Sequence, residues 1–125
     1  MKLLPLSLLT LSLLSSLSFV APAAFAEEMA ITKADDILVT TSGMTVYTFD
    51  NDTAGKSVCN GPCAANWPPV APKGTPSAPF SVIKRDDGSP QLAFNGKPLY
   101  TFAADKKAGD RNGDNFKNIW HVVKN

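Results

Sequence analysis

Two cysteines and the single histidine are the residues of this chain best suited to redox or metal chemistry. Cys59 and Cys63 enclose three residues, and the turn-forming pair Gly61-Pro62 can fold one thiol toward the other. A disulfide is the favoured outcome, worth about 2 kcal/mol for so short a loop. A redox-active pair is more typical of C-x-x-C spacing at a helix N-terminus. A soft-metal site that joins both thiolates to His121 stays open, and Cu(I) suits such ligands.

A second group of candidate ligands lies in a loop rich in oxygen donors. Its members are Asp105, Gly109, Asp110, Asn112, Gly113 and Asp114. An EF-hand that starts at position 110 needs glycine at position 115 and glutamate at position 121, where the chain has Asn115 and His121. An irregular metal site with Asp110, Asp114 or His121 stays possible, beside the alternative of a solvated Asp/Asn/Gly loop.

Catalysis needs a nucleophile, a base or a metal that a second group holds in place. The sequence places His121 in no known motif with a serine or cysteine, and its acidic residues form no recognisable catalytic pair. His121 follows Trp120 within a strand pattern, so the two side chains are expected on opposite faces. We therefore expect no enzymatic activity, no cofactor and a surface histidine.

These residues sit in a chain that contains the same segment twice. When residues 43–70 are aligned with residues 96–123, seven of the 28 positions hold identical residues. Two unrelated sequences would share about two identical residues over this length. The first set is Gly43, Tyr47, Thr48, Phe49, Asp52, Trp67 and Val70, and the second is Gly96, Tyr100, Thr101, Phe102, Asp105, Trp120 and Val123. Such a period means that one structural unit is used twice, and that neither copy buries its aromatic face alone.

Short alternating runs between turn residues predict an all-β fold. Strands are expected at 29–32, 37–41 and 44–49 in the first copy, at 80–85, 91–94 and 98–102 in the second, and at 119–123. Asn95-Gly96 is the strongest hairpin signal, because both central residues of a type I′ turn need positive φ. We predict two tandem three-stranded meanders that pack with pseudo-twofold symmetry.

The chain is expected to hold one domain behind an export signal. Lys2, an apolar run over 3–14 and Ala24-Phe25-Ala26 are typical of a signal peptide over 1–26. A domain over 27–125 would then hold repeats 27–70 and 80–125, joined by a proline-rich connector, 68–79, that suits no central strand. Cleavage after Ala26 predicts a periplasmic protein with no membrane insertion and an oxidising environment for its cysteines.

The charge balance excludes some classes of partner. The chain has 12 Lys and Arg against 11 Asp and Glu, and removing Lys2 with the signal leaves 11 of each. A neutral domain without a basic cluster is a poor partner for nucleic acid or for an anionic membrane surface.

The duplicated Tyr-x-Phe-x-x-Asp segment is the main candidate for binding. Because strand side chains alternate, Tyr47 and Phe49 share one face of their strand. The set comprises Tyr47, Phe49, Asp52, Trp67, Tyr100, Phe102, Asp105 and Trp120. These residues form either the core of a small domain or a groove between the copies lined by tyrosine hydroxyls and carboxylates. Both alternatives predict a Tyr–Asp or Trp–backbone hydrogen bond.

The segments 47–52 (YTFDND) and 100–105 (YTFAAD) resemble the bacterial secreted-repeat family, described as predicted lipoproteins with a Yx(FWY)xxD motif. The likeness extends through 55–57, 59–69, 95–100, 109–110 and 120–121. The resemblance implies a protein of unknown activity and supplies no catalytic residues. The chain lacks the lipobox cysteine of the lipoprotein members, which favours a soluble periplasmic form.

Export, small size, duplicated aromatic faces and the missing catalytic signature favour a non-enzymatic binding or interaction module with a protein or small-molecule partner in the cell envelope. The alternative is a metal-handling or electron-transfer accessory that uses Cys59, Cys63, His121 or the loop 105–114. Inhibition of a hydrolase is a third hypothesis, which rests on size and location alone.

Overall fold

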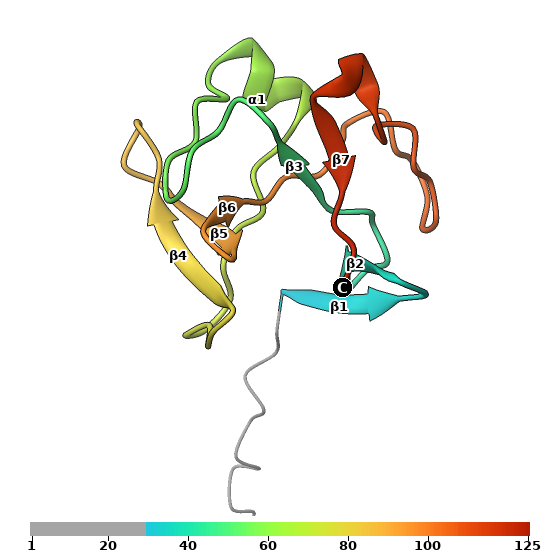
Figure 1. Ribbon diagram of the computed structural model, residues 1–125, viewed down its shortest axis with the longest axis horizontal. Helices are drawn as coiled ribbons and strands as arrows, with labels where there is room; N and C mark the ends of the chain where they lie inside the picture. Colours follow the sequence, from blue (N-terminus) through green and yellow to red (C-terminus); the bar gives the residue numbers. More distant parts are fainter. Residues whose placement is uncertain (1–29) are drawn as a thin grey trace, which may run out of the picture.

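The computed structural model describes residues 30–125 (Figure 1). The predicted signal peptide and its cleavage site lie outside the described residues. The elements are β1 (Ile31–Ala34), β2 (Ile37–Thr40), β3 (Tyr47–Phe49), α1 (Pro62–Asn66), β4 (Phe80–Lys84), β5 (Pro90–Phe94), β6 (Lys97–Pro98), the 3-10 helix η1 (Phe116–Asn118) and β7 (Trp120–Val122). The described part of the chain is thus nearly all-β, as predicted.

Three small antiparallel sheets form the fold. The β4–β5–β6 sheet lies on one side of the molecule, and α1 lies at the end opposite the β1–β2 hairpin (Figure 1). The second copy holds a three-stranded antiparallel sheet, with β5 between β4 and a β6 of only two residues. In the first copy, β3 pairs with β7, and the residues before β3 meet β2 at an isolated bridge between Val39 and Thr45. The predicted meander is therefore not confirmed for the first copy.

Strands β3 and β6 are shorter than the sequence pattern predicts, because their backbones change partner within a few residues. Leu99 N–H donates to Leu92, whereas the next residue, Tyr100, pairs with Tyr47. Thr101 N–H then donates to the Pro68 carbonyl at 2.8 Å. Each exchange of partner ends a regular ladder while keeping the main-chain groups bonded, as burial requires.

The start of the proline-rich connector takes part in this backbone pairing. The Pro68 carbonyl accepts from Thr101, and Val70 both donates to Leu99 at 2.9 Å and accepts from Leu92 at 2.8 Å. Proline lacks only the donor, so a carbonyl-accepting position tolerates it. Residues 68–70 therefore belong to the folded core as much as to a spacer.

The hairpin between β5 and β6 has the turn that its sequence predicts. Asn95 and Gly96 have φ of 50° and 79°, which is the left-handed geometry of a type I′ turn.

Within residues 30–125, no helix has the length and apolar character needed to cross a bilayer.

Two hydrophobic clusters fill the interior. The first consists of aliphatic side chains, with Leu38, Val46, Leu92 and Leu99 among its most buried members. The second consists of Tyr47, Cys59, Trp67, Tyr100 and Trp120, with Phe49, Phe102 and Ile119 packed against it. The aliphatic cluster supports the strands, and the aromatic cluster carries the candidate site.

Candidate functional site

The two copies meet at their equivalent tyrosines. Tyr47 N–H donates to the Tyr100 carbonyl at 2.8 Å, and Tyr100 N–H donates to the Tyr47 carbonyl at 2.9 Å. These residues are 53 positions apart, which is the period of the repeat. The chain thus pairs a residue with its own copy, and this contact brings the strand exits of both repeats together.

The tyrosine hydroxyls bind the aspartates of the opposite copy. Tyr47 OH donates to Asp105 Oδ2 at 2.6 Å, and Tyr100 OH donates to Asp52 Oδ2 at 2.5 Å. Both tyrosines are fully buried. Burial, and then the hydrogen bond to the carboxylate, raises the pKa of each phenol well above its usual value. The phenols are therefore held neutral, as hydrogen-bond donors.

Each aspartate also fixes the loop that follows its own strand exit. Asp52 Oδ1 accepts from Val58 N–H at 2.7 Å, and Asp105 Oδ1 accepts from Asn112 N–H at 3.0 Å. Burial raises the pKa of Asp52, while the hydrogen bonds from Tyr100 and Val58 oppose that shift. The Tyr-x-Phe-x-x-Asp segment is thus a clamp between the copies, and the predicted Tyr–Asp hydrogen bond is present.

The phenylalanines and tryptophans of the motif form a stack of four parallel rings. Trp67 and Trp120 lie at the centre, with ring centroids 3.8 Å apart and planes 2° apart. Phe49 stacks on Trp120 at 4.1 Å, and Phe102 stacks on Trp67 at 4.0 Å. The order Phe49, Trp120, Trp67, Phe102 alternates between the copies, so both repeats are needed to build it.

The tyrosine rings brace this stack from the side. Tyr47 meets Trp67 edge-on at 5.3 Å, and Tyr100 meets Trp120 edge-on at 5.1 Å. Such T-shaped contacts are favourable because the positive edge of one ring faces the negative face of another. Trp67 and Trp120 are 4% and 3% exposed. The prediction that these aromatic residues form the core of a small domain therefore holds for most of the tryptophan surface.

One side of the stack nevertheless opens into a cavity of about 460 Å³. Its aromatic lining comprises Phe49, Trp67, Phe102, Phe116 and Trp120, and Cys63, Asn66, Ala104, Lys117 and Ile119 complete it. The tyrosine hydroxyls and the carboxylates of Asp52 and Asp105 are not part of this lining. Four of the eight motif residues therefore reach the cavity, and the other four hold the copies together.

Phe116 and Lys117 are cavity residues that sequence reasoning missed. Phe116 meets Trp67 at 5.7 Å and is 38% exposed, and the Lys117 ammonium lies 5.6 Å from the Phe116 ring centre. Position 116 is the repeat equivalent of Cys63, which lines the same cavity. This correspondence is the sequence feature that could have identified Phe116 as a cavity residue. Hydrophobic periodicity could not have done so, because Phe116 is a single aromatic residue in a polar loop.

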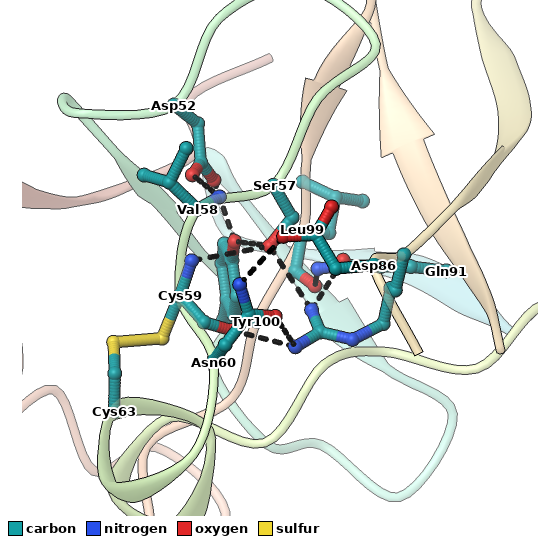
Figure 2. The surroundings of a disulfide bond; sticks show 11 residues. Asp52, Ser57, Val58, Cys59, Asn60, Cys63, Asp86, Gln91, Leu99 and Tyr100 are labelled. Atoms are coloured by element: carbon teal, nitrogen blue, oxygen red, sulfur yellow. Dashed lines mark hydrogen bonds between the residues drawn. A yellow bond between two sulfur atoms is a disulfide. The ribbon is translucent and has the colours of Figure 1, made fainter. Parts of the chain in front are cut away.

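The predicted disulfide is present between Cys59 and Cys63 (Figure 2). Its sulfurs are bonded to one another and are thus not thiolate ligands in this structure. Cys59 is fully buried in the aromatic cluster, and Cys63 lines the cavity. The disulfide therefore borders the cavity through Cys63.

The buried Arg85 binds the disulfide loop through the Cys59 carbonyl. The sequence did not predict this role. Arg85 Nη2 donates to the Cys59 carbonyl at 2.6 Å, and Nη1 donates to Gln91 Oε1 at 2.8 Å and to Ser57 Oγ at 3.0 Å. Ser57 Oγ lies 2.6 Å from Tyr100 OH (Figure 2). The network therefore connects the disulfide loop to the Tyr–Asp clamp.

Replacing Arg85 by methionine is expected to lower the free energy of unfolding by about 2–3 kcal/mol, because buried acceptors on Cys59, Gln91 and Ser57 lose their donor. Urea unfolding followed by circular dichroism measures the change. Lys84→Met is the matched control, since Lys84 is the exposed neighbour on β4, and it should change stability by less than about 0.5 kcal/mol. Equal losses in the two variants would contradict the role of the network.

The acidic loop and His121 do not converge on a metal site. Asp110 accepts from the N–H groups of Lys106 and Lys107, and Asp114 accepts from Val122 N–H. His121 Nε2 lies 2.7 Å from Asp50 Oδ2, and its Nδ1 lies 3.1 Å from Asn115 Oδ1. Among residues 30–125, no three His, Cys, Asp or Glu side chains come together as metal ligands.

Close packing explains why position 113, in the loop 105–114, is a glycine. A Cβ at Gly113 would lie 2.6 Å from the Trp67 ring, and Gly113 N–H donates to Tyr47 OH at 3.2 Å. The loop therefore approaches the aromatic cluster more closely than a residue with a side chain could.

Comparison with known proteins agrees with the duplicated architecture. Neither a curated protein nor a solved structure matches the chain. One family matches twice, over residues 29–71 and 81–124, so each match covers one copy of the repeat. Together the two matches span most of the chain, and they confirm the resemblance carried by the Tyr-x-Phe-x-x-Asp segments. The chain therefore belongs to the family described as a secreted repeat of unknown function.

Proposed function

We propose that this protein is a non-enzymatic binding module of the cell envelope, and that it holds a small ligand with an apolar ring in the aromatic cavity. The observation that carries the proposal is the cavity of about 460 Å³, lined by five aromatic side chains from both repeats. Small-molecule sites commonly have volumes of about 300–1,000 Å³ and a mainly apolar lining.

The state of the reactive side chains supports a binding role over catalysis. Both ring nitrogens of His121 already lie within hydrogen-bond distance of oxygen atoms, on Asp50 and Asn115. The raised pKa values of Tyr47 and Tyr100 disfavour a phenolate nucleophile. A general base must be within reach of a substrate proton, and neither group meets that condition at the cavity.

Two finer features of the architecture belong to the same proposal. The reciprocal contacts of Tyr47 with Tyr100 and of Trp67 with Trp120 support a pseudo-twofold relation between the repeats. The signal-like segment over 1–26 supports export to the periplasm with cleavage after Ala26. Export would also favour the disulfide that borders the cavity.

The direct test uses N-phenyl-1-naphthylamine, a neutral aromatic probe that fluoresces in apolar surroundings. The only two tryptophans of the chain line the cavity, so binding should quench their emission while the probe brightens. We expect saturable binding with one probe per chain. Phe116→Ala should weaken it at least threefold, since one aromatic contact contributes about 0.5–1.5 kcal/mol beyond its buried area.

Val82→Ala is the matched control for this experiment. Val82 is an exposed apolar residue on β4 that does not line the cavity, and its truncation should leave the probe affinity unchanged. Binding that is absent, or that Phe116→Ala leaves untouched, would remove the cavity from the proposal.

A further inference from the structure

We infer that the ligand of the cavity is a small planar aromatic anion, such as an aromatic carboxylate, and that Lys117 recognises its charge. The inference rests on the proposed function and specifies its ligand class. Three observations carry it: the nature of the lining, the sign of the charge at the rim, and the backbone that carries Lys117.

The lining favours a flat ring over an aliphatic chain. The cavity runs along the stack from Phe49 at one end to Phe102 at the other, and both end rings are partly exposed. Among the ring contacts of residues 30–125, Phe49 has a parallel neighbour on Trp120 alone. A planar ligand can extend or border this stack with the offset or edge-on geometry that aromatic pairs prefer.

The charge at the rim is positive. Lys117 is the one charged residue in the cavity lining. A second ammonium lies close by, because Lys106 Nζ donates to the Ala103 carbonyl at 2.9 Å, between the lining residues Phe102 and Ala104. No carboxylate lines the cavity, and the nearby Asp105 is occupied by Tyr47 and Asn112. The charge of the lining itself therefore favours an anion, while the neighbouring carboxylate of Asp50 lies against His121 Nε2 at 2.7 Å.

The backbone places Lys117 at the rim in a conformation that its side chain does not favour. Lys117 has φ of 50°, between Asn115 at 60° and Asn118 at 58°. Asparagine adopts this left-handed region readily, whereas lysine does so at a cost. Three left-handed residues within positions 115–118 hold Phe116 and Lys117 beside the stack, and unfavourable backbone conformations concentrate at binding sites.

The test compares three ligands that share one ring system and differ in charge: 2-naphthoate, 2-naphthalenemethanol and 2-naphthylmethylammonium. Binding to the oxidised, ¹⁵N-labelled chain is followed through the two tryptophan indole N–H signals. We expect the carboxylate to bind about three- to fivefold more tightly than the alcohol, as one partly exposed ion pair allows. The ammonium should bind most weakly, and high salt should remove the difference.

Lys117→Asn tests the assigned residue, because asparagine suits the left-handed backbone and removes the charge. The variant should lose the preference for 2-naphthoate while its affinity for the alcohol changes less than twofold. Lys117→Arg should retain the preference. Lys124→Gln is the control, since Lys124 lies at a different cavity.

The outcomes separate the two proposals. If the alcohol binds as tightly as 2-naphthoate, the charge inference is overturned and the binding function stands. A preference for the anion that survives Lys117→Asn would overturn the role of Lys117. If none of the three ligands, nor N-phenyl-1-naphthylamine, moves the tryptophan signals, the cavity is not a ligand site and both proposals fall.

Discussion

Trp67→Ala is expected to lower the free energy of unfolding by about 3–5 kcal/mol, a large part of the stability of a single domain. Trp67 is 4% exposed and stacks on both Trp120 and Phe102. It also meets Tyr47 edge-on, so its removal opens a cavity at the centre of the stack. Urea unfolding, followed by far-ultraviolet circular dichroism, measures the change.

The repeat supplies a demanding control for this prediction. Trp120→Ala should cost the same within about 1 kcal/mol, because Trp120 makes the equivalent contacts with Phe49 and Tyr100. Trp67→Phe, which keeps a ring in place, should cost less than either alanine variant. A loss below about 1.5 kcal/mol for Trp67→Ala would mean that the stack contributes little to the fold.

The protein is expected to lose stability steeply above about pH 10, by up to about 2.7 kcal/mol per pH unit. Burial and the bonds to Asp105 and Asp52 raise the pKa of Tyr47 and Tyr100 in the folded state. The unfolded chain releases these protons near pH 10 and then binds fewer protons than the folded chain. Stability is therefore fully present below that pH and falls as pH rises toward the folded-state pKa values.

Two measurements check this prediction. Absorbance at 295 nm should show no tyrosinate in the folded protein at pH 11, since both tyrosines of the chain are in the clamp. Urea titrations between about pH 8 and pH 11.5 give the slope, and Tyr47→Phe should reduce it by about 1.4 kcal/mol per pH unit. Tyrosinate that forms near pH 10 without unfolding would contradict the buried Tyr–Asp bonds.

Local patterns predicted much of the fold correctly. Alternation and turn residues located β2, β4, β5 and β7 to within a few residues. Buried residues mark β2, β5 and β7, whereas β4 has no buried residue and was located by its short apolar run before the turn at Asp87-Gly88. Asn95-Gly96 predicted its turn because few residue pairs accept two successive positive φ values. The short lengths of β3 and β6 could not be predicted, since they depend on which distant strand each residue meets.

The candidate site was only partly predictable. Repetition identified its aromatic residues and aspartates, and local spacing predicted the disulfide. Phe116, Lys117 and Arg85 were missed because each acquires its role from residues distant in the chain. Arg85 can be buried because Ser57, Gln91 and the Cys59 carbonyl accept hydrogen bonds from its guanidinium group. No local sequence pattern predicts that these acceptors come together.

The sequence by itself determined the residue types and their period: a duplicated aromatic motif, an all-β pattern and a cysteine pair close enough to bond. Only the tertiary structure decided that Tyr47 would bind Asp105 instead of Asp52 of its own copy, and that the rings of the two copies would alternate in one stack. The physical reason is that a repeat specifies what each copy carries and leaves open how the copies pair. That pairing follows from burying the aromatic faces while satisfying every buried phenol and backbone group.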